Sequence, residues 1–228
     1  MMDETVVKIL KEINNHGYEA YLVGGYPRDR YMNIYSTDYD ICTNADIDIL
    51  KSFLNVEKVE FLSSIVKEDN KVFEITRYRK DLEYKNHRYP KKVVPANSLI
   101  EDLQRRDFII NTLCMDADGN YIDLLNARND IDNKIIRTVG NADDKICEDI
   151  LRSLRAVRFA TVLNFTLDED LKKAIKKHRD LIKLLSVNRI NKEIDKILNS
   201  KNKYYGISLL EELDILDIIE NKINMKIK

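Results

Sequence analysis

Two aspartates one residue apart, Asp38 and Asp40, stand in the otherwise apolar stretch TDYDICT. The stretch reads as a β-strand, in which residues two apart point to the same face. Both carboxylates would then project side by side and repel each other unless a cation lay between them. Hard oxygen ligands at this spacing suit Mg²⁺, so the pair predicts a magnesium site.

A third carboxylate, Glu74, lies in VFEIT, which reads as a separate strand. Beside Asp38 and Asp40 it would complete a set of three carboxylates around two Mg²⁺ ions. Such a site catalyses phosphoryl transfer, because one metal lowers the pKa of an attacking hydroxyl and the other stabilises the leaving pyrophosphate. A D-x-D pair alone is a weak signal, since surface strands often carry it.

Gly24 and Gly25 precede PRDRYMN, which reads as a short helix. A Gly-Gly turn lets backbone N–H groups approach a triphosphate closely, and the N-terminus of a following helix adds partial positive charge. Arg28, in the first turn, could ion-pair the same phosphates. A glycine pair before a helix is common, but GG-x-x-R-D followed nine residues later by D-x-D is a more specific combination.

The composition is that of a globular soluble protein, with 228 residues, 44% hydrophobic and 34% charged. No apolar run approaches the roughly 20 residues of a membrane-spanning helix, and MMDETVVKILKEI reads as an amphipathic helix rather than a signal peptide. The three cysteines and three histidines are scattered and form no zinc spacing. We therefore expect a cytoplasmic protein with no membrane partner. The net charge of −1 argues against a bulk polycation but not against a basic patch.

Hydrophobic periodicity predicts an α+β first half and an all-α second half. In the first half we expect helices at 3–16, in PRDRYMN and from the capping box SLIE through EDLQRRD. We expect strands in EAYLV, TDYDICT and KVFEITRYR, and a hairpin in LCMDADGNYIDLL. In the second half we expect helices near 143–163, 168–183, 187–199 and 204–221. The change of pattern places a domain boundary near residue 138, with domains of residues 1–138 and 139–228.

Ordered motifs extend from about residue 16 to about residue 200: HGYEAYLVGGYPRD, DYDICT, FEITRYRKDLEYKNHRYP, SLIEDLQRRDFIINTL, YIDLLNARNDIDNKIIRTVG, EDILRSLRAVRFA and SVNRINKEIDKIL. On these motifs the chain resembles the bacterial tRNA nucleotidyltransferase and poly(A) polymerase family, the class II CCA-adding enzymes of the polymerase-β superfamily. The resemblance implies a polymerase-β-like nucleotidyltransferase head with a small mixed sheet, followed by a helical neck that holds the base-reading site. It also implies template-independent addition of C, C and A to the 3′ end of tRNA, with CTP and ATP as substrates.

Carried over position by position, the resemblance implies roles for individual residues. Asp38 and Asp40 resemble the metal ligands, and Glu74 resembles the third catalytic carboxylate. The nucleotide contacts would be Gly24, Gly25, Arg28 and Arg106, with an incoming-nucleotide site at Asp149, Arg152, Arg155 and Arg158. The segment RYRKDLEYKNHRYP resembles the flexible loop that the family needs when it switches from adding C to adding A. The chain departs from the family pattern at Tyr26, Pro27 and RYMN, which bears on the local turn geometry rather than on the chemistry.

Asp149 and the three arginines recur at i+3 steps and would form a slowly turning stripe on one helix. Cytosine and adenine each present an amino donor beside a ring acceptor, so Asp149 would accept and Arg152 would donate. Uracil and guanine present a carbonyl and a ring N–H there, and each mismatched contact costs about 1–3 kcal/mol. The alternative is a solvated helix with an ion pair from Glu148 to Arg152.

Tyr84 interleaves with basic residues that include Arg79 and Arg88. This pattern predicts contacts with single-stranded RNA by stacking and charge. A mobile solvated loop is the alternative.

Other functions of the same family stay open: a poly(A) polymerase, an A-only-adding enzyme, or an inactive RNA-binding remnant. The family continues past the neck into body and tail domains that hold the tRNA elbow, whereas this sequence stops at Lys228. We therefore expect the chain to read the acceptor end and little else of its tRNA. A homo-oligomer or a partner protein could supply the remaining grip.

Overall fold

The computed structural model describes residues 2–60 and 62–227, which form two compact units. The first unit contains the chain up to Leu82 together with Lys92–Ile131. The second contains Glu83–Lys91 and the chain from Asp132 onward. The chain passes from the first unit to the second at 131/132, and the tip of one hairpin belongs to the second unit; the domain boundary near 138 stays a prediction.

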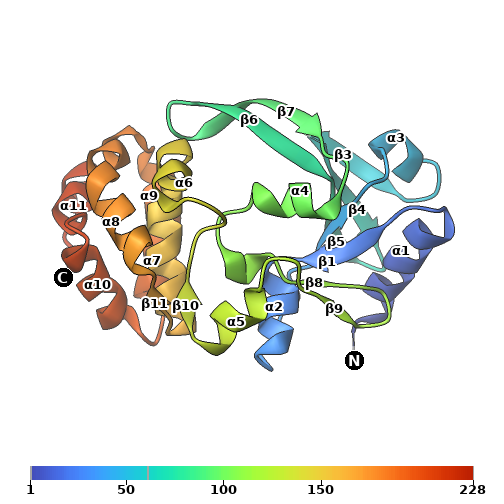
Figure 1. Ribbon diagram of the computed structural model, residues 1–228, viewed down its shortest axis with the longest axis horizontal. Coiled ribbons are helices and arrows are strands. Elements are labelled where there is room, and N and C mark those ends of the chain that lie inside the picture. The colour runs from blue at the N-terminus through green and yellow to red at the C-terminus, as the bar shows by residue number, and fades with distance from the viewer. Residues whose placement is uncertain (1, 61, 228) are drawn as a thin grey trace. The chain divides into compact units, whose positions relative to one another are not determined.

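A seven-stranded mixed sheet forms the centre of the first unit (Figure 1). The strand order is β3-β4-β5-β2-β1-β8-β9, with β2 and β5 parallel and the other neighbours antiparallel. The strands are β1 (Ala20–Val23), β2 (Asp40–Thr43), β3 (Val56–Glu60), β4 (Ser63–Glu68), β5 (Lys71–Arg77), β8 (Cys114–Met115) and β9 (Tyr121–Ile122). The helices are α1 (Glu4–Asn15), α2 (Gly25–Tyr31), α3 (Ile47–Leu50), α4 (Leu99–Gln104), the 3₁₀ turn η1 (Ile109–Asn111) and α5 (Ala127–Asp132).

The two faces of this sheet pack against different helices. On one face Leu22, Ile41 and Ile75 are neighbours across β1, β2 and β5, and they share a core with α1. On the other face Cys42 shares a core with Leu103 of α4. The expected α+β class is confirmed for this unit.

Capping explains where α1 begins, and it corrects the expectation for α4. Asp3 accepts a hydrogen bond from the Thr5 N–H at 3.0 Å, which satisfies one free donor of the first turn of α1. The expected capping box is incomplete, because Ser98 caps no N–H with its side chain and Glu101 instead accepts from the N–H of Asn97 at 2.9 Å. The α4 helix also ends at Gln104, before the expected RRD.

The segment RYRKDLEYKNHRYP, which resembles the flexible loop of the family, contains a β-hairpin. Its strands, β6 (Arg79–Lys85) and β7 (Tyr89–Pro95), make a separate two-stranded sheet. Asn86 and His87 in the turn have positive φ angles of 55° and 50°.

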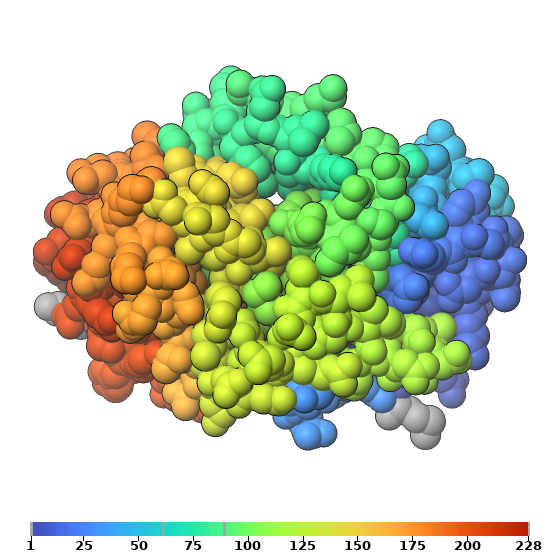
Figure 2. Space-filling model, in the orientation of Figure 1, coloured from blue at the N-terminus to red at the C-terminus, as the bar shows by residue number. Residues whose placement is uncertain are grey.

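The second unit is mainly helical. It contains α6 (Ala142–Glu148), α7 (Leu151–Leu163), α8 (Glu169–His178), the 3₁₀ segment η2 (Arg179–Leu184), α9 (Val187–Leu198), α10 (Lys203–Glu212) and α11 (Leu216–Ile223). The strands β10 (Ile135–Ile136) and β11 (Thr166–Leu167) pair in parallel. Because β11 lies beyond residue 139, that region is not purely α-helical, contrary to the expectation. Side chains around α8, coloured orange, lie on the surface in Figure 2.

Two expected helices are interrupted. The helix predicted at 143–163 breaks at Asp149, whose backbone is extended (φ −142°, ψ 99°). The helix predicted at 204–221 breaks at 213–215, where Asp214 has a φ of 57°. Within the described residues no helix combines the length and the apolar character needed to cross a membrane.

Candidate active site

The two aspartates lie against the glycine turn of the first unit. Asp40 is the first residue of β2, and Asp38 precedes the strand, so the expectation that both belong to one strand is wrong. A Cβ atom built on Gly24 would lie 3.6 Å from Asp40 Oδ2, and one built on Gly25 would lie 3.7 Å from Asp38 Oδ2. Gly24 also has a φ of 85°, a conformation that favours glycine. The turn thus admits both carboxylates at close range.

Glu74 is the register partner of Asp40 on the parallel strand β5, so both side chains point to the same face of the sheet. Burial, Asp38 and Glu74 together raise the pKa of Asp40 to about 6, while the charge of Arg106 opposes the rise. The first unit therefore holds an excess of negative charge at this point.

The donor chemistry of these carboxylates fits a hard divalent cation. Carboxylate oxygens are the ligands that Mg²⁺ prefers, and a cation would relieve the repulsion that raises the pKa of Asp40. Among residues 2–60 and 62–227, however, no three His, Cys, Asp or Glu side chains converge as a preformed metal cluster. Glu74, the expected third carboxylate, lies opposite Asp40 in the strand register, and its charge helps to raise the pKa of Asp40.

Arg28 is buried and engaged with protein groups. It donates to Asp29 Oδ1 from Nε at 2.8 Å and to Asn111 Oδ1 from Nη1 at 2.6 Å. Its Nη2 would lie 3.8 Å from a Cβ atom on Gly25, so the guanidinium borders the glycine turn, and its role as a phosphate contact stays a prediction.

Arg106 is held by Asp102, which is completely buried. Arg106 Nη2 donates to Asp102 Oδ2 at 3.1 Å, and Arg105 Nε donates to Oδ1 at 2.9 Å. Arg79, expected to contact RNA, donates its backbone N–H to the same Oδ1 at 3.1 Å, and its side chain lies 3.4 Å from Asp81.

In the second unit, Asp149 separates α6 from α7 instead of belonging to one long helix. Its Oδ1 accepts from the N–H of Leu151 at 3.0 Å, which satisfies a free donor in the first turn of α7. Its Oδ2 forms an ion pair with Arg88 of the hairpin tip. Burial raises the pKa of Asp149 although Arg88 and Arg152 lower it.

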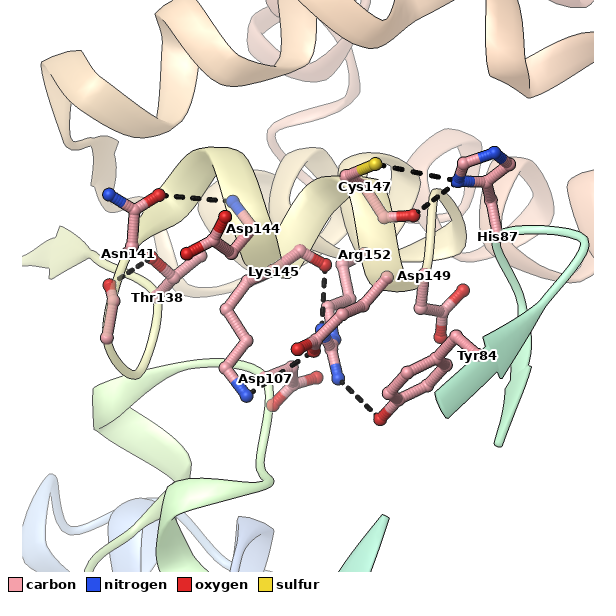
Figure 3. Close-up of polar contacts among 12 residues, drawn as sticks. Tyr84, His87, Asp107, Thr138, Asn141, Asp144, Lys145, Cys147, Asp149 and Arg152 are labelled. Carbon is pink, nitrogen blue, oxygen red and sulfur yellow. Dashed lines mark hydrogen bonds and ion pairs between the residues drawn. The ribbon is translucent and has the colours of Figure 1, made fainter. Parts of the chain in front are cut away.

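Arg152 forms the ion pair with Glu148 that the alternative interpretation predicted, at 2.8 Å. The helix face is not solvated there, because the side chain of Arg152 is only 6% exposed. Arg152 also donates to the carbonyl of Lys145 at 2.7 Å and to the hydroxyl of Tyr84 at 3.3 Å (Figure 3). Asp149, Arg152 and two of the expected RNA-binding residues, Tyr84 and Arg88, are thus brought together.

The hairpin tip docks on the α6–α7 junction through further contacts. His87 Nδ1 donates to the carbonyl of Cys147 at 2.6 Å (Figure 3). The carbonyl of His87 accepts from the N–H of Ile150 at 3.0 Å. Backbone and side-chain contacts therefore hold Tyr84 and Arg88 at the expected base-reading residues.

The remaining two arginines of α7 also contact other side chains. Arg155 lies over the ring of Phe159, with 5.4 Å between its guanidinium carbon and the ring centroid. Arg158 pairs with Glu193 of α9 at 2.9 Å, which joins two packed helices. Arg158 therefore has a structural partner, whereas the charge of Arg155 also lowers the pKa of Asp149, and the nucleotide-binding role of both arginines stays a prediction.

Comparisons with known proteins identify the family. The model of the poly A polymerase head domain matches residues 20–137, just over half of the chain, and the chain therefore belongs to this family. A second model, described as "Probable RNA and SrmB- binding site of polymerase A", matches residues 164–223.

Curated relatives and solved structures agree with this assignment. CCA-adding enzymes of Bacillus velezensis and Bacillus subtilis are 37% and 39% identical over 94% and 92% of this chain, but over 56% and 54% of their own length. A crystal structure of the Bacillus stearothermophilus CCA-adding enzyme in complex with CTP has a TM-score of 0.87 and 33% identity over 96% of this chain and 54% of that chain. A tRNA nucleotidyltransferase complexed with a primer tRNA and an incoming ATP analog has a TM-score of 0.76 at 27% identity, over 92% of this chain and 62% of that one. This chain thus spans about half the length of the curated relatives that it matches.

Proposed function

We propose that this chain is a nucleotidyltransferase that adds C, C and A to the 3′ end of tRNA from CTP and ATP without a nucleic-acid template. The observation that carries the proposal is the group at the α6–α7 junction, where an acceptor, Asp149, and a donor, Arg152, lie together among buried residues. The similarity to CCA-adding enzymes across most of the chain supports it.

In the first unit, Asp38, Asp40 and Glu74 would hold divalent metal, and Mg²⁺ suits their oxygen ligands best. Bound metal would lower the pKa of the attacking 3′ hydroxyl and stabilise the leaving pyrophosphate. The backbone at Gly24 and Gly25 approaches the triphosphate, since no Cβ atom stands in the way.

In the second unit, Asp149 accepts from the exocyclic amino group of cytosine or adenine, and Arg152 donates to the neighbouring ring nitrogen. Both side chains also bond to protein groups, Asp149 to Arg88 of the hairpin tip and Arg152 to Glu148, so a base would share them with these partners. Base reading is therefore coupled to the hairpin tip, as expected for a segment involved in the change from C to A.

A poly(A) polymerase or an A-only-adding enzyme is the second candidate, because the family model that matches the first unit carries the description of a poly A polymerase head domain. Asp149 and Arg152 accept adenine as readily as cytosine, so these two residues alone do not separate the alternatives.

The test is incubation with tRNA that lacks its 3′ CCA, with Mg²⁺ and each labelled nucleotide alone, then with CTP and ATP together. We expect CTP alone to add two residues, ATP to follow only after CTP, and UTP and GTP to add nothing. Long ATP-only products would identify a poly(A) polymerase. Binding of tRNA with no incorporation of any nucleotide would identify an inactive RNA-binding protein.

A further inference from the structure

Three aromatic rings lie behind the carboxylates of the first unit. Tyr39, which stands between Asp38 and Asp40 in the chain, has its ring centroid 5.7 Å from that of Phe73, at an angle of 26° between the rings. The centroid of Tyr39 also lies 4.9 Å from that of Tyr26, whose ring is tilted by 51°. Both distances are typical of attractive aromatic pairs. Tyr26, Tyr39 and Phe73 thus form a connected aromatic group.

The aromatic group and the carboxylates belong to opposite faces of the sheet. Phe73 directly precedes Glu74 on β5, and successive side chains of a strand alternate between the two faces. Phe73 is completely buried in the core that includes α1, and Tyr39 packs against the same core. The register partners Asp40 and Glu74 therefore each follow an aromatic residue whose ring stacks behind the sheet.

Tyr26 connects this aromatic group to the glycine turn. It follows Gly25 as the second residue of α2, and its side chain is buried in the same core. Its hydroxyl accepts from Arg30 Nη1 at 3.3 Å, one helical turn further along α2. A Cβ atom built on Gly25 would lie 3.7 Å from Asp38 Oδ2. The contact between Tyr26 and Tyr39 therefore joins the two segments that meet at the carboxylates.

We propose that Tyr26 and Tyr39 are positioning residues that hold the glycine turn against the segment that carries the metal-binding aspartates. This inference rests on the proposed function, because it concerns the metal site of that reaction. Like charges at Asp38, Asp40 and Glu74 repel one another and favour separation of the segments that carry them. The rings behind the sheet oppose this separation, so that a divalent cation meets a backbone that is already in place.

The test measures Mn²⁺ binding to the full chain by electron paramagnetic resonance, without nucleotide or tRNA. Tyr26→Leu and Tyr39→Leu each remove one ring, whereas Tyr26→Phe and Tyr39→Phe keep the ring and lose the hydroxyl. We expect each leucine change to weaken Mn²⁺ binding at least about fivefold and the double leucine variant to lose little more, because both changes remove the same contact. Both phenylalanine variants should stay within about twofold of the parent.

Phe53→Leu is the matched control, because it removes a ring of the same unit that stacks on a different partner, His16, at 3.9 Å. All proteins are compared at a temperature where each is folded, so that a loss of stability alone leaves Mn²⁺ affinity unchanged, as we expect for the control. Parent-like binding by both leucine variants, additive losses, an equal loss in Phe53→Leu, or no Mn²⁺ binding by the parent would each overturn the inference.

If the leucine variants fail to fold, hydrogen exchange of the parent carries the test. We expect the backbone N–H groups of residues 38–41 to change their exchange rates by less than about threefold when Mn²⁺ is added. A larger rise in protection would mean that the metal orders this segment, and would overturn the inference. A parent that binds Mn²⁺ in this ring-dependent way but adds no nucleotide to tRNA would contradict the proposed function and leave the positioning role standing.

Discussion

At Asp40 the local charge balance affects the stability of the fold. Its pKa is raised from 3.8 to about 6 by burial, Asp38 and Glu74. Because the folded-state pKa is the higher one, the protonated carboxyl contributes stability that is complete below about pH 4 and is lost as the pH rises through 6. Metal-free protein should therefore carry a destabilising charge at neutral pH.

We expect Asp40→Asn to stabilise the metal-free protein at pH 7.5 by about 2 kcal/mol and to abolish nucleotide addition in Mg²⁺. The gain should disappear below pH 4, where the parent carboxyl is protonated. Urea unfolding in EDTA across this pH range measures the effect. The control is Asp48→Asn, whose side chain is 90% exposed and should change stability by less than about 0.5 kcal/mol. A variant less stable than the parent at pH 7.5, or one that keeps normal turnover, would contradict the assignment.

Asp149 gives a second prediction, because Arg88 is the largest influence that lowers its pKa. Arg88→Ala should raise that pKa further. Only an ionised Asp149 accepts freely from the cytosine amino group. When the pH is lowered, Arg88→Ala should therefore lose its selection of CTP over UTP at a higher pH than the parent does. Incorporation ratios between pH 5.5 and 8.5 measure this, with Lys91→Ala of the same hairpin as control. Loss of selection at the same pH in all three proteins would rule out the Arg88 effect.

At the scale of single residues, the sequence predicted which side chains carry charge into the site but not which partners hold them. Arg28 donates to Asn111, 83 positions away, as well as to its neighbour Asp29, and Arg158 pairs with Glu193 on another helix. No local pattern reports such contacts. The sequence analysis missed that Asp102 binds Arg105 and Arg106. The spacing in EDLQRRD could have indicated it, because these arginines follow Asp102 at i+3 and i+4.

At the scale of elements, strong periodicity predicted the helices well. The expected helices at 3–16 and 187–199 correspond to α1 and α9, because each buries one apolar stripe. The strand β3 was missed because its VEKVE sequence is mostly exposed and shows no alternation. The break between α6 and α7 was missed because it depends on the side chain of Asp149, which caps the next helix instead of continuing the first.

Helix packing in the second unit depends on Gly206. A Cβ atom there would lie 2.5 Å from Thr161 Oγ1 of α7 and 2.6 Å from Ile197 Cγ2 of α9. Gly206→Ala should therefore destabilise the protein by about 1–3 kcal/mol, although alanine favours helices intrinsically. The control is Ser208→Ala on the exposed side of α10, expected within about 0.5 kcal/mol. The measurement is the denaturant midpoint of each variant relative to that of the parent. An unchanged or higher midpoint for Gly206→Ala would mean that α10 moves away from α7 and α9 at little cost.

At the scale of the whole molecule, the described residues beyond 200 should make few contacts with distal tRNA. Phosphate contacts come mostly from Lys and Arg. Beyond residue 200, Lys222 already donates to the carbonyl of Lys183 at 2.8 Å, and Lys226 pairs with Glu220 at 2.6 Å. The apolar side chains of this segment, such as Leu210 and Leu213, are buried in packing.

We therefore expect this chain to extend a minihelix of acceptor and T stems nearly as well as full tRNA. The measurement is kcat/KM for the two substrates at one fixed salt concentration. We expect the two values to lie within about tenfold of each other. A preference for full tRNA by two orders of magnitude, about 2.7 kcal/mol, would contradict this. It would indicate that a second subunit or a partner protein holds the tRNA elbow.

The central claim is that side chains of this chain, rather than a nucleic-acid template, select C, C and A. Its most direct test is sequencing of the 3′ ends formed on CCA-less tRNA when all four nucleotides are supplied at equal concentration with Mg²⁺. The parent should give CCA ends and then stop, and Asp149→Ala should incorporate mismatched nucleotides or none while still binding tripolyphosphate. Mixed or poly(A) ends from the parent, or CCA ends from Asp149→Ala with undiminished selection against UTP, would contradict the account.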